Sequence, residues 1–378
     1  MKTKESPLVT FTRKLKEHDA LKRCPNKKMV GLIYVKLLLS EPFRRREQKK
    51  YKDAVDNITP EKAPVFIIGH WRSGTTYLHQ LMSHDPEFFF QTKYQNFFSD
   101  NFLSSEGFFK PLISKIIQLL SPAREWKSNI SRTMNLDAPS ESDTALISEI
   151  SEVTYHWGHL FPKAYQRYFD KYLFFDNLTK AELEEWKYKM RTMLNKTYLK
   201  HDSGRLLIKN PGDTARIKHL LDIYPEAKFV FIHRDPYEVF YSNMKLWSHV
   251  LSTVSLQQIT DQEKRKIVLD IYKKLHQKYL DQRELLKSDQ LAEIGHREIL
   301  TAPEETLKKI YNKLGIHDFN KALPYIRAFL QQQPPAKDNR YSPDPEDIKE
   351  INHEWKFAFR LWNYPMASPS PDELTVAG

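Results

Sequence analysis

The feature that most constrains this chain is the run Val65–Tyr77, VFIIGHWRSGTTY, in which an apolar segment leads into a loop with two glycines. Val65–Ile68 is apolar and largely β-branched, which predicts a buried strand. Gly69 and Gly74 stand five positions apart, and Thr75–His84 has the apolar spacing of a helix. A strand, a G-x-x-x-x-G loop and a helix N-terminus together predict a phosphate cradle, because backbone N–H groups and the helix dipole face the anion.

The residue after Gly74 narrows the choice of phosphate ligand. Nucleotide kinases and ATPases have lysine at this position, whereas this chain has Thr75. A loop without that lysine is poorly equipped to hold β- and γ-phosphates together, and it suits one 5′-phosphate bonded to a smaller transferable group. A P-loop nucleotide kinase and a non-enzymatic binding module therefore stay as the less favoured alternatives.

Later segments predict an α/β fold with a central parallel sheet flanked by helices. Leu206–Ile208 and Lys228–His233 are short apolar runs typical of buried strands, and Ala215–Tyr224 has helical spacing between them. A further helix is expected from Pro236, because Asp235 is a favourable N-cap and proline is favoured in the first turn. Strands that alternate with helices in this way favour a parallel sheet. We expect helical segments to continue to about residue 330.

Composition divides the chain into three parts: a basic arm over residues 1–60, a main domain over 61–365 and a loose tail over 366–378. The arm holds 16 Lys and Arg against 7 Asp and Glu, so nearly all of the net charge of +11 belongs to it. Because the main domain is close to neutral, the high isoelectric point does not indicate nucleic-acid binding. A single cysteine, Cys24, fits a reducing compartment, and we expect a cytoplasmic location.

Within the arm, Met29–Leu39 is an apolar run interrupted by Lys36 and flanked by basic residues. Its eleven residues are too few to cross a bilayer whose core is about 30 Å thick. Two interpretations stay open: a helix that packs on the main domain, or an interfacial helix that brings residues 27–46 to a membrane surface.

The run Arg72–Thr76, RSGTT, resembles the 5′-phosphosulfate-binding loop of sulfotransferases that use 3′-phosphoadenosine-5′-phosphosulfate (PAPS). The resemblance implies that Ser73, Gly74, Thr75 and Thr76 hold the 5′-phosphate. Arg72 would stabilise the bridging oxygen as charge develops on it. Tyr77 matches an aromatic position that stacks on adenine in cytosolic members, although a core aromatic on a helix face is an equally good interpretation.

A second run, Leu206–Asn243, resembles the 3′-phosphate-binding region of the same family. There Arg234 at the end of a strand and Ser242 on the following helix would grip the 3′-phosphate, for which the arginine fork is suited. The resemblance covers roughly residues 62–364, and the K-N-P sequence at Lys209–Pro211 is similar to the bacterial-type branch. It implies a P-loop-like sulfotransferase fold that needs no metal and releases 3′,5′-diphosphoadenosine.

The resemblance to cytosolic members does not extend to their general base. Pro211 stands where cytosolic members have a catalytic histidine. Glu141 lies in DAPSESDTAL, a segment similar to one of the bacterial-type branch, and it is the preferred base. Asp137 and Asp143 are close to it in sequence and would add like-charge repulsion. Lys209 would join Arg72 in stabilising the departing nucleotide.

Three histidines remain as alternative bases: His70, His156 and His159. His156 and His159 could suggest a metal, but no further ligands cluster with them in the sequence, so no metal site is expected. The acceptor is expected to be a small molecule with a hydroxyl group. The many Phe and Tyr residues of positions 88–175 favour a lipophilic alcohol, such as a sterol or hydroxylated lipid, and a carbohydrate is the alternative. We expect the helices of residues 97–200 to cover the acceptor pocket.

Overall fold

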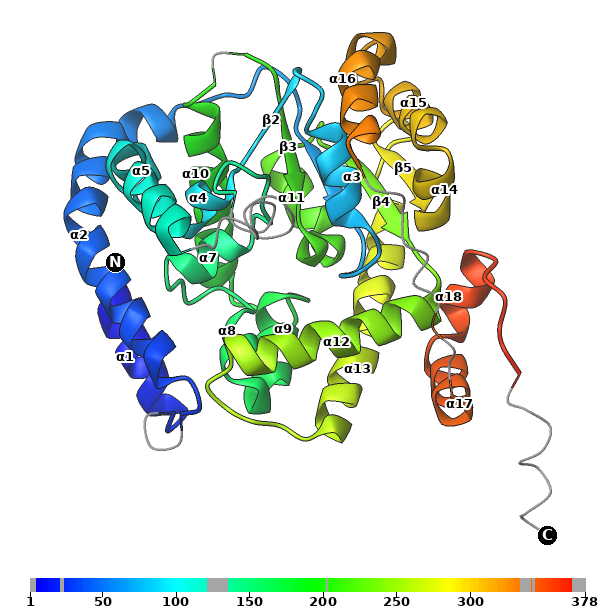
Figure 1. Ribbon diagram of the computed structural model, residues 1–378, viewed down its shortest axis with the longest axis horizontal. Helices are drawn as coiled ribbons and strands as arrows, with labels where there is room; N and C mark the ends of the chain where they lie inside the picture. Colours follow the sequence, from blue (N-terminus) through cyan, green and yellow to red (C-terminus); the bar gives the residue numbers. More distant parts are fainter. Residues whose placement is uncertain are drawn as a thin grey trace.

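The computed structural model describes residues 5–20, 24–120, 135–201, 203–333, 341 and 344–368 of the 378-residue chain. Its centre is a parallel sheet in which the strands lie in the order β2-β3-β1-β4-β5 (Figure 1). The strands are β1 (Val65–Ile68), β2 (Phe88–Phe90), β3 (Arg205–Lys209), β4 (Lys228–His233) and β5 (Leu291–Gly295). The expected α/β fold with a central parallel sheet is therefore confirmed.

The three strands predicted from the sequence form the middle of this sheet. β1 and β4 have the predicted bounds, and β3 is one residue longer at each end. The two edge strands, β2 and β5, were not predicted, and β5 lies in the stretch up to about residue 330 for which only helical segments were expected. An edge strand has a neighbour on one side only. β2 has only three residues, and Glu293 of β5 is exposed.

Both faces of the sheet are buried, because successive side chains of a strand point to opposite faces. Val65 and Ile67 of β1 belong to the core on one face. That face is covered by α3 (Thr75–Met82), α14 (His296–Thr301), α15 (Pro303–Leu314) and α16 (Phe319–Gln331) (Figure 1). Phe66 and Ile68 belong to the larger core on the opposite face.

The larger core is formed with most of the remaining helices. Four of them also border the candidate active site described below: α8 (Trp157–Leu160), α9 (Tyr165–Tyr172), α12 (Pro236–Thr253) and α13 (Asp261–Arg283). The Asp235 side chain caps α12 by accepting hydrogen bonds from the N–H groups of Tyr237 and Glu238, as predicted. The other elements are α4 (Lys93–Phe97), α5 (Phe102–Leu120), α7 (Thr144–Ser148), α10 (Lys180–Tyr198), the 3₁₀ helices η1 (Pro162–Ala164) and η2 (Pro211–Ala215), α11 (Ile217–Ile223), α17 (Pro345–Glu354) and α18 (Lys356–Leu361).

The basic arm forms two helices that pack on the main domain, α1 (Pro7–Glu17) and α2 (Lys27–Asp56). The apolar run at 29–39 is therefore part of a helix of 30 residues rather than a short one. Phe11 of α1 and Leu37 of α2 are buried in the larger core. One face of each helix is thus fixed to the body. Of the expected tail at 366–378, residues 369–378 lie outside the described part of the chain.

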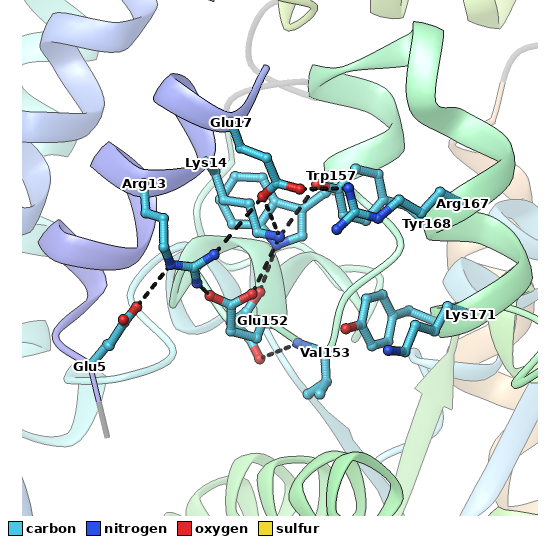
Figure 2. A network of polar contacts seen from close by, with 12 residues as sticks. Glu5, Arg13, Lys14, Glu17, Glu152, Val153, Trp157, Arg167, Tyr168 and Lys171 are labelled. Atoms are coloured by element: carbon cyan, nitrogen blue, oxygen red, sulfur yellow. Dashed lines mark hydrogen bonds and ion pairs between the residues drawn. The ribbon is translucent and has the colours of Figure 1, made fainter. Parts of the chain in front are cut away.

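A polar network joins α1 to α8 and α9 (Figure 2). The Lys14 side chain is only 5% exposed, and its Nζ lies 3.4 Å from carboxylate oxygens of both Glu17 and Glu152 and 3.3 Å from the Tyr168 hydroxyl. Burial lowers the pKa of Lys14. Arg167 of α9 pairs with Glu17 at 2.5 Å. Since buried ionic groups are costly unless they are paired, this network fixes where α1 sits.

Candidate active site

The loop between β1 and α3 takes the shape that its two glycines allow. Gly69 and Gly74 have φ angles of 137° and 100°, in the region that favours glycine. A Cβ atom would lie 2.4 Å from the Ile232 carbonyl oxygen at Gly69 and 2.4 Å from His296 Cδ2 at Gly74. Arg72 is left-handed as well, with a φ of 71°. The chain therefore turns tightly at the carboxyl end of β1, and the N-terminus of α3 follows at once.

Two segments that are far apart in sequence meet at this loop. Arg72 Nε donates a hydrogen bond of 2.8 Å to Ser242 Oγ of α12. Arg234 Nη1 donates to the Arg72 carbonyl oxygen at 3.0 Å, and Arg234 Nε pairs with Glu238 at 2.5 Å. Because β1 and β4 are parallel neighbours, their carboxyl ends bring the loop and the start of α12 to one edge of the sheet. This edge is where open α/β sheets bind ligands.

A lysine–carboxylate pair lies beside the same loop. Lys209 ends β3, and residue 141 pairs with it as an isolated parallel bridge. Lys209 Nζ lies 2.5 Å from Glu141 Oε1 and 3.4 Å from Thr76 Oγ1. The Lys209 side chain is 4% exposed and that of Glu141 is 30% exposed. Three residues singled out from the sequence are thus in contact, and Glu141 is the one that solvent or an acceptor can reach.

The expected like-charge neighbours of Glu141 are engaged elsewhere, so that part of the sequence interpretation is wrong. Asp143 is buried and accepts hydrogen bonds of 3.0 and 2.8 Å from Arg216 Nη1. Asp137 is mostly exposed and pairs with Lys110. The reason is local: the 141–143 turn sends Glu141 toward Lys209 and Asp143 toward the interior. Burial, together with Asp143, raises the pKa of Asp213 in this buried cluster.

A cavity of about 480 Å³ opens beside these groups. Seven of the residues singled out from the sequence line it: Arg72, Gly74, Thr75, Thr76, Tyr77, Glu141 and Arg234. Three others are connected to these lining residues. Ser73 is a buried residue of the same loop, Lys209 bonds to Glu141, and Ser242 bonds to Arg72. The two motifs that were read separately in the sequence therefore border one cavity.

The three alternative bases also line this cavity. His70 Nδ1 lies 2.8 Å from the Trp71 carbonyl oxygen, and burial lowers the pKa of His70 to about 4. Burial and then Arg216 lower the pKa of His156 to about 3, and burial lowers that of His159 well below its ordinary value. A general base works best with a pKa near the working pH. These histidines are therefore neutral but weak bases.

A second group of residues that line the cavity is mainly apolar, apart from two histidines. It consists of His156, His159 and Phe169 of α8 and α9 and of Leu246, Trp247, Val250, Val268 and Ile271 of α12 and α13. The expectation that helices of residues 97–200 cover the pocket accounts for the first three only. The sequence interpretation missed the residues of α12 and α13. Their signal was present, because Asn243, Trp247 and Val250 follow Ser242 at helical spacing on one face.

His156 and His159, the pair that could suggest a metal, both line this cavity. The rings of His156 and His159 meet edge to face, with centroids 5.2 Å apart. Within the described ranges, no three His, Cys, Asp or Glu side chains come together as a metal site requires.

Comparison with known proteins places this geometry in a family. A model of the sulfotransferase family matches residues 64–320. The chain is 29% identical over 314 residues to an omega-hydroxy-beta-dihydromenaquinone-9 sulfotransferase, Stf3, in Mycobacterium bovis and in Mycobacterium tuberculosis. That alignment covers 83% of this chain and 78% of each relative.

Solved structures show the same fold. Sulfotransferase STF9 from Mycobacterium avium aligns with a TM-score of 0.70 at 16% identity, over 86% of this chain and 82% of that one. Sulfotransferase STF1 from Mycobacterium tuberculosis aligns with a TM-score of 0.65 at 15% identity, over 93% of both chains. Because a model of the family spans more than half of the sequence, this chain belongs to the sulfotransferase family.

Proposed function

We propose that this sulfotransferase takes its sulfuryl group from PAPS and transfers it to the hydroxyl of a lipophilic alcohol. The observation that carries the donor assignment is the contact between the two phosphate motifs through Arg72, Ser242 and Arg234. The loop offers backbone N–H groups and a helix N-terminus for a 5′-phosphate. Arg234, which donates a hydrogen bond to the Arg72 carbonyl oxygen, offers a guanidinium for a second phosphate on the ribose.

The roles of the loop residues follow from this placement. Ser73, Gly74, Thr75 and Thr76 bind the 5′-phosphate, and Arg234 with Ser242 binds the 3′-phosphate. Arg72 stabilises the bridging oxygen and Tyr77 contacts the adenine. The reaction places negative charge on the leaving nucleotide, so fixed cations at that point lower the barrier more than they stabilise the bound substrate.

Glu141 and Lys209 act on the acceptor side. The acceptor oxygen forms a bond to sulfur as the bond between sulfur and the 5′-phosphate oxygen breaks, and 3′,5′-diphosphoadenosine leaves. The proton of the acceptor hydroxyl passes to the Glu141 carboxylate. Lys209, 2.5 Å from that carboxylate and 3.4 Å from Thr76, supplies positive charge between base and loop. Such a transfer depends mainly on positioning and charge neutralisation.

The apolar part of the cavity lining supports a lipophilic acceptor. Phe169, Trp247, Val250, Val268 and Ile271 offer no charge and few hydrogen-bonding groups to a sugar. The relative whose name specifies an acceptor acts on a hydroxylated menaquinone. The cavity volume is in the lower part of the range of about 300–1,000 Å³ that holds one small ligand. It therefore suits the reacting ends of donor and acceptor, and a long lipid tail would extend outside.

An acceptor screen tests this proposal. The purified protein is incubated with PAPS and, separately, with a sterol, a hydroxylated isoprenoid quinone, a long-chain alcohol and a set of sugars. Sulfated product and 3′,5′-diphosphoadenosine are measured together by mass spectrometry. We expect sulfation of at least one lipid alcohol. Sulfation of sugars alone would overturn the acceptor assignment, and the absence of any PAPS turnover would overturn the donor assignment.

A further inference from the structure

A surface outside the active site carries most of the large apolar side chains that this chain exposes. Fifteen such residues are exposed among the described ones, and eight of them lie on α2, α4 and α5. The eight form what we call the α2–α5 face: Leu32, Val35, Leu38, Leu39, Phe97, Phe108, Leu112 and Ile116. Contiguous apolar surface of this kind marks an interaction site, because scattered single residues are the normal pattern.

The face is continuous across two neighbouring helices. Leu32, Val35 and Leu39 follow one another at the three- and four-residue spacing that places side chains on one side of α2. Phe108, Leu112 and Ile116 do the same on α5, with exposed fractions of 61%, 48% and 45%. The two rows are joined by Phe43 of α2, whose ring lies 5.9 Å from that of Phe108 and 4.8 Å from that of Phe109.

The exposed charges of the face are all positive. On α2, Lys28 precedes the apolar row, and Arg46 and Lys50 follow it on the same side of the helix. Exposed positions of α2 include seven Lys or Arg between residues 27 and 52, and two acidic residues, Asp53 and Asp56, in its last turn. On α5, Lys115 is exposed beside the apolar row. Lys28 and Arg46 have no ionic partner within the described ranges, so their charge is available to an external anion.

We propose that the α2–α5 face binds the surface of an anionic phospholipid bilayer. Leucine, valine and phenylalanine side chains enter the boundary between headgroups and acyl chains, and the flanking lysines and arginines meet lipid phosphates. No helix in the described part of the chain is long and apolar enough to span a bilayer. Because the exposed apolar side chains follow one side of α2 and of α5, the proposed contact is one of helix faces lying in the plane of the membrane. Of the two interpretations of residues 27–46, packing on the main domain is confirmed for one face of α2, and contact with a membrane is our proposal for the opposite face.

α2 is connected to the wall of the acceptor cavity through α1. α1 and α2 lie together on one side of the molecule (Figure 1), and the network of Figure 2 fixes α1 to α8 and α9, which line the acceptor cavity. A lipid acceptor with a tail too long for the cavity would stay partly in the bilayer while its hydroxyl reacts. This role for a lipid acceptor rests on the proposed function, whereas the exposed apolar and basic residues of the α2–α5 face do not depend on it.

Vesicle flotation tests the proposal with the full-length chain. Wild-type protein is mixed with vesicles of phosphatidylcholine, with and without phosphatidylglycerol, and the bound fraction gives a partition coefficient. We expect binding that requires phosphatidylglycerol and weakens between about 0.1 M and about 1 M salt, where the screening length falls from about 10 to about 3 Å. Failure to float with either lipid overturns the proposal.

Matched variants separate the apolar and charged contributions. Leu32→Ser, Val35→Ser and Leu112→Ser combined should lower the partition coefficient about 30-fold or more, because each side chain is about half exposed or more before it is buried. Arg46→Gln with Lys50→Gln should lower it about fivefold for each residue. The controls Leu285→Ser with Tyr325→Ser, which are each 52% exposed elsewhere, should bind as wild type does.

Two further measurements distinguish other outcomes. Light scattering without lipid shows whether the face instead joins two copies of the chain; a dimer that the triple variant dissociates, without vesicle binding, contradicts the proposal. Calorimetry with 3′,5′-diphosphoadenosine should give the same affinity for wild type and every surface variant. If the wild type fails to bind this nucleotide, the proposed function fails while the vesicle result still stands or falls separately.

Discussion

Replacing Glu141 by glutamine tests the assignment of the general base. Glutamine has nearly the same shape and keeps an oxygen that can accept the hydrogen bond from Lys209, now 2.5 Å long. Since the Lys209 side chain is only 4% exposed, retaining a partner matters. Alanine would leave Lys209 without its carboxylate partner, at a cost of about 1–3 kcal/mol. Glutamine removes the basic carboxylate and little else.

The expected effect of Glu141→Gln is confined to turnover. General-base help contributes about 10²–10⁴-fold, so kcat should fall by that factor. Affinity for 3′,5′-diphosphoadenosine should stay unchanged, because Glu141 faces the acceptor side. The assay combines initial rates of sulfated product, nucleotide calorimetry and a thermal melt that checks folding. Asp137→Asn is the matched control, since Asp137 belongs to the same segment and pairs at the surface with Lys110.

A near-normal kcat for Glu141→Gln would refute this reasoning. Glu141 would then serve to hold Lys209 near Thr76, and the proton would have to go elsewhere. An equal loss of kcat and of nucleotide affinity would also contradict it, because that pattern indicates a collapsed site. The base assignment requires that turnover alone is lost.

Three further predictions concern the loop, the metal and pH. Gly74→Ala should cost about 1–3 kcal/mol of stability and weaken nucleotide binding, because its Cβ would lie 2.4 Å from His296 at a φ of 100°. The control is Gly31→Ala, which has open space around it inside α2. In calorimetry it should bind nucleotide as wild type does, and in a thermal melt it should be about 0.5–1 kcal/mol more stable, because alanine favours a helix interior. Sulfation should persist in EDTA, and activity restored only by Mg²⁺ would contradict the reaction proposed here. The free energy of unfolding should fall as the pH drops from about 6.5 toward 4, because burial lowers the pKa of His70 to about 4 and of His156 to about 3, so the unfolded chain binds more protons; urea melts at several pH values measure this, and a flat profile would contradict it.

The central strands could be predicted from the sequence because each is buried on both faces and therefore continuously apolar. Val65–Ile68 and Lys228–His233 are such runs, and their bounds match the structure. The edge strands could not be predicted in the same way. Phe88–Phe90 is only three residues long, and Leu291–Gly295 contains an exposed glutamate, so neither has a distinctive pattern.

The loop proposed to bind the nucleotide was easier to predict than the surroundings of Glu141 and the apolar part of the cavity. Loop residues such as Gly74 are fixed by local backbone geometry, which a short motif encodes. The partner of Glu141 depends on β3 lying beside the 141–143 turn, a contact between residues 68 positions apart. No local pattern reports that contact, which explains why Asp143 was expected to face Glu141 and instead pairs with Arg216. Trp247 and its neighbours were missed because an apolar helix face predicts core and pocket equally well.

Calorimetry with two nucleotides tests the central claim, that this site is built for PAPS, most directly. Arg234 is the cation proposed for the 3′-phosphate, and a charge-assisted hydrogen bond contributes about 1.5–3 kcal/mol. Wild-type protein should therefore bind 3′,5′-diphosphoadenosine roughly 10- to 150-fold more tightly than AMP. Arg234→Ala should remove most of that difference while leaving AMP affinity unchanged. Equal affinities of the wild type for the two nucleotides would contradict the account.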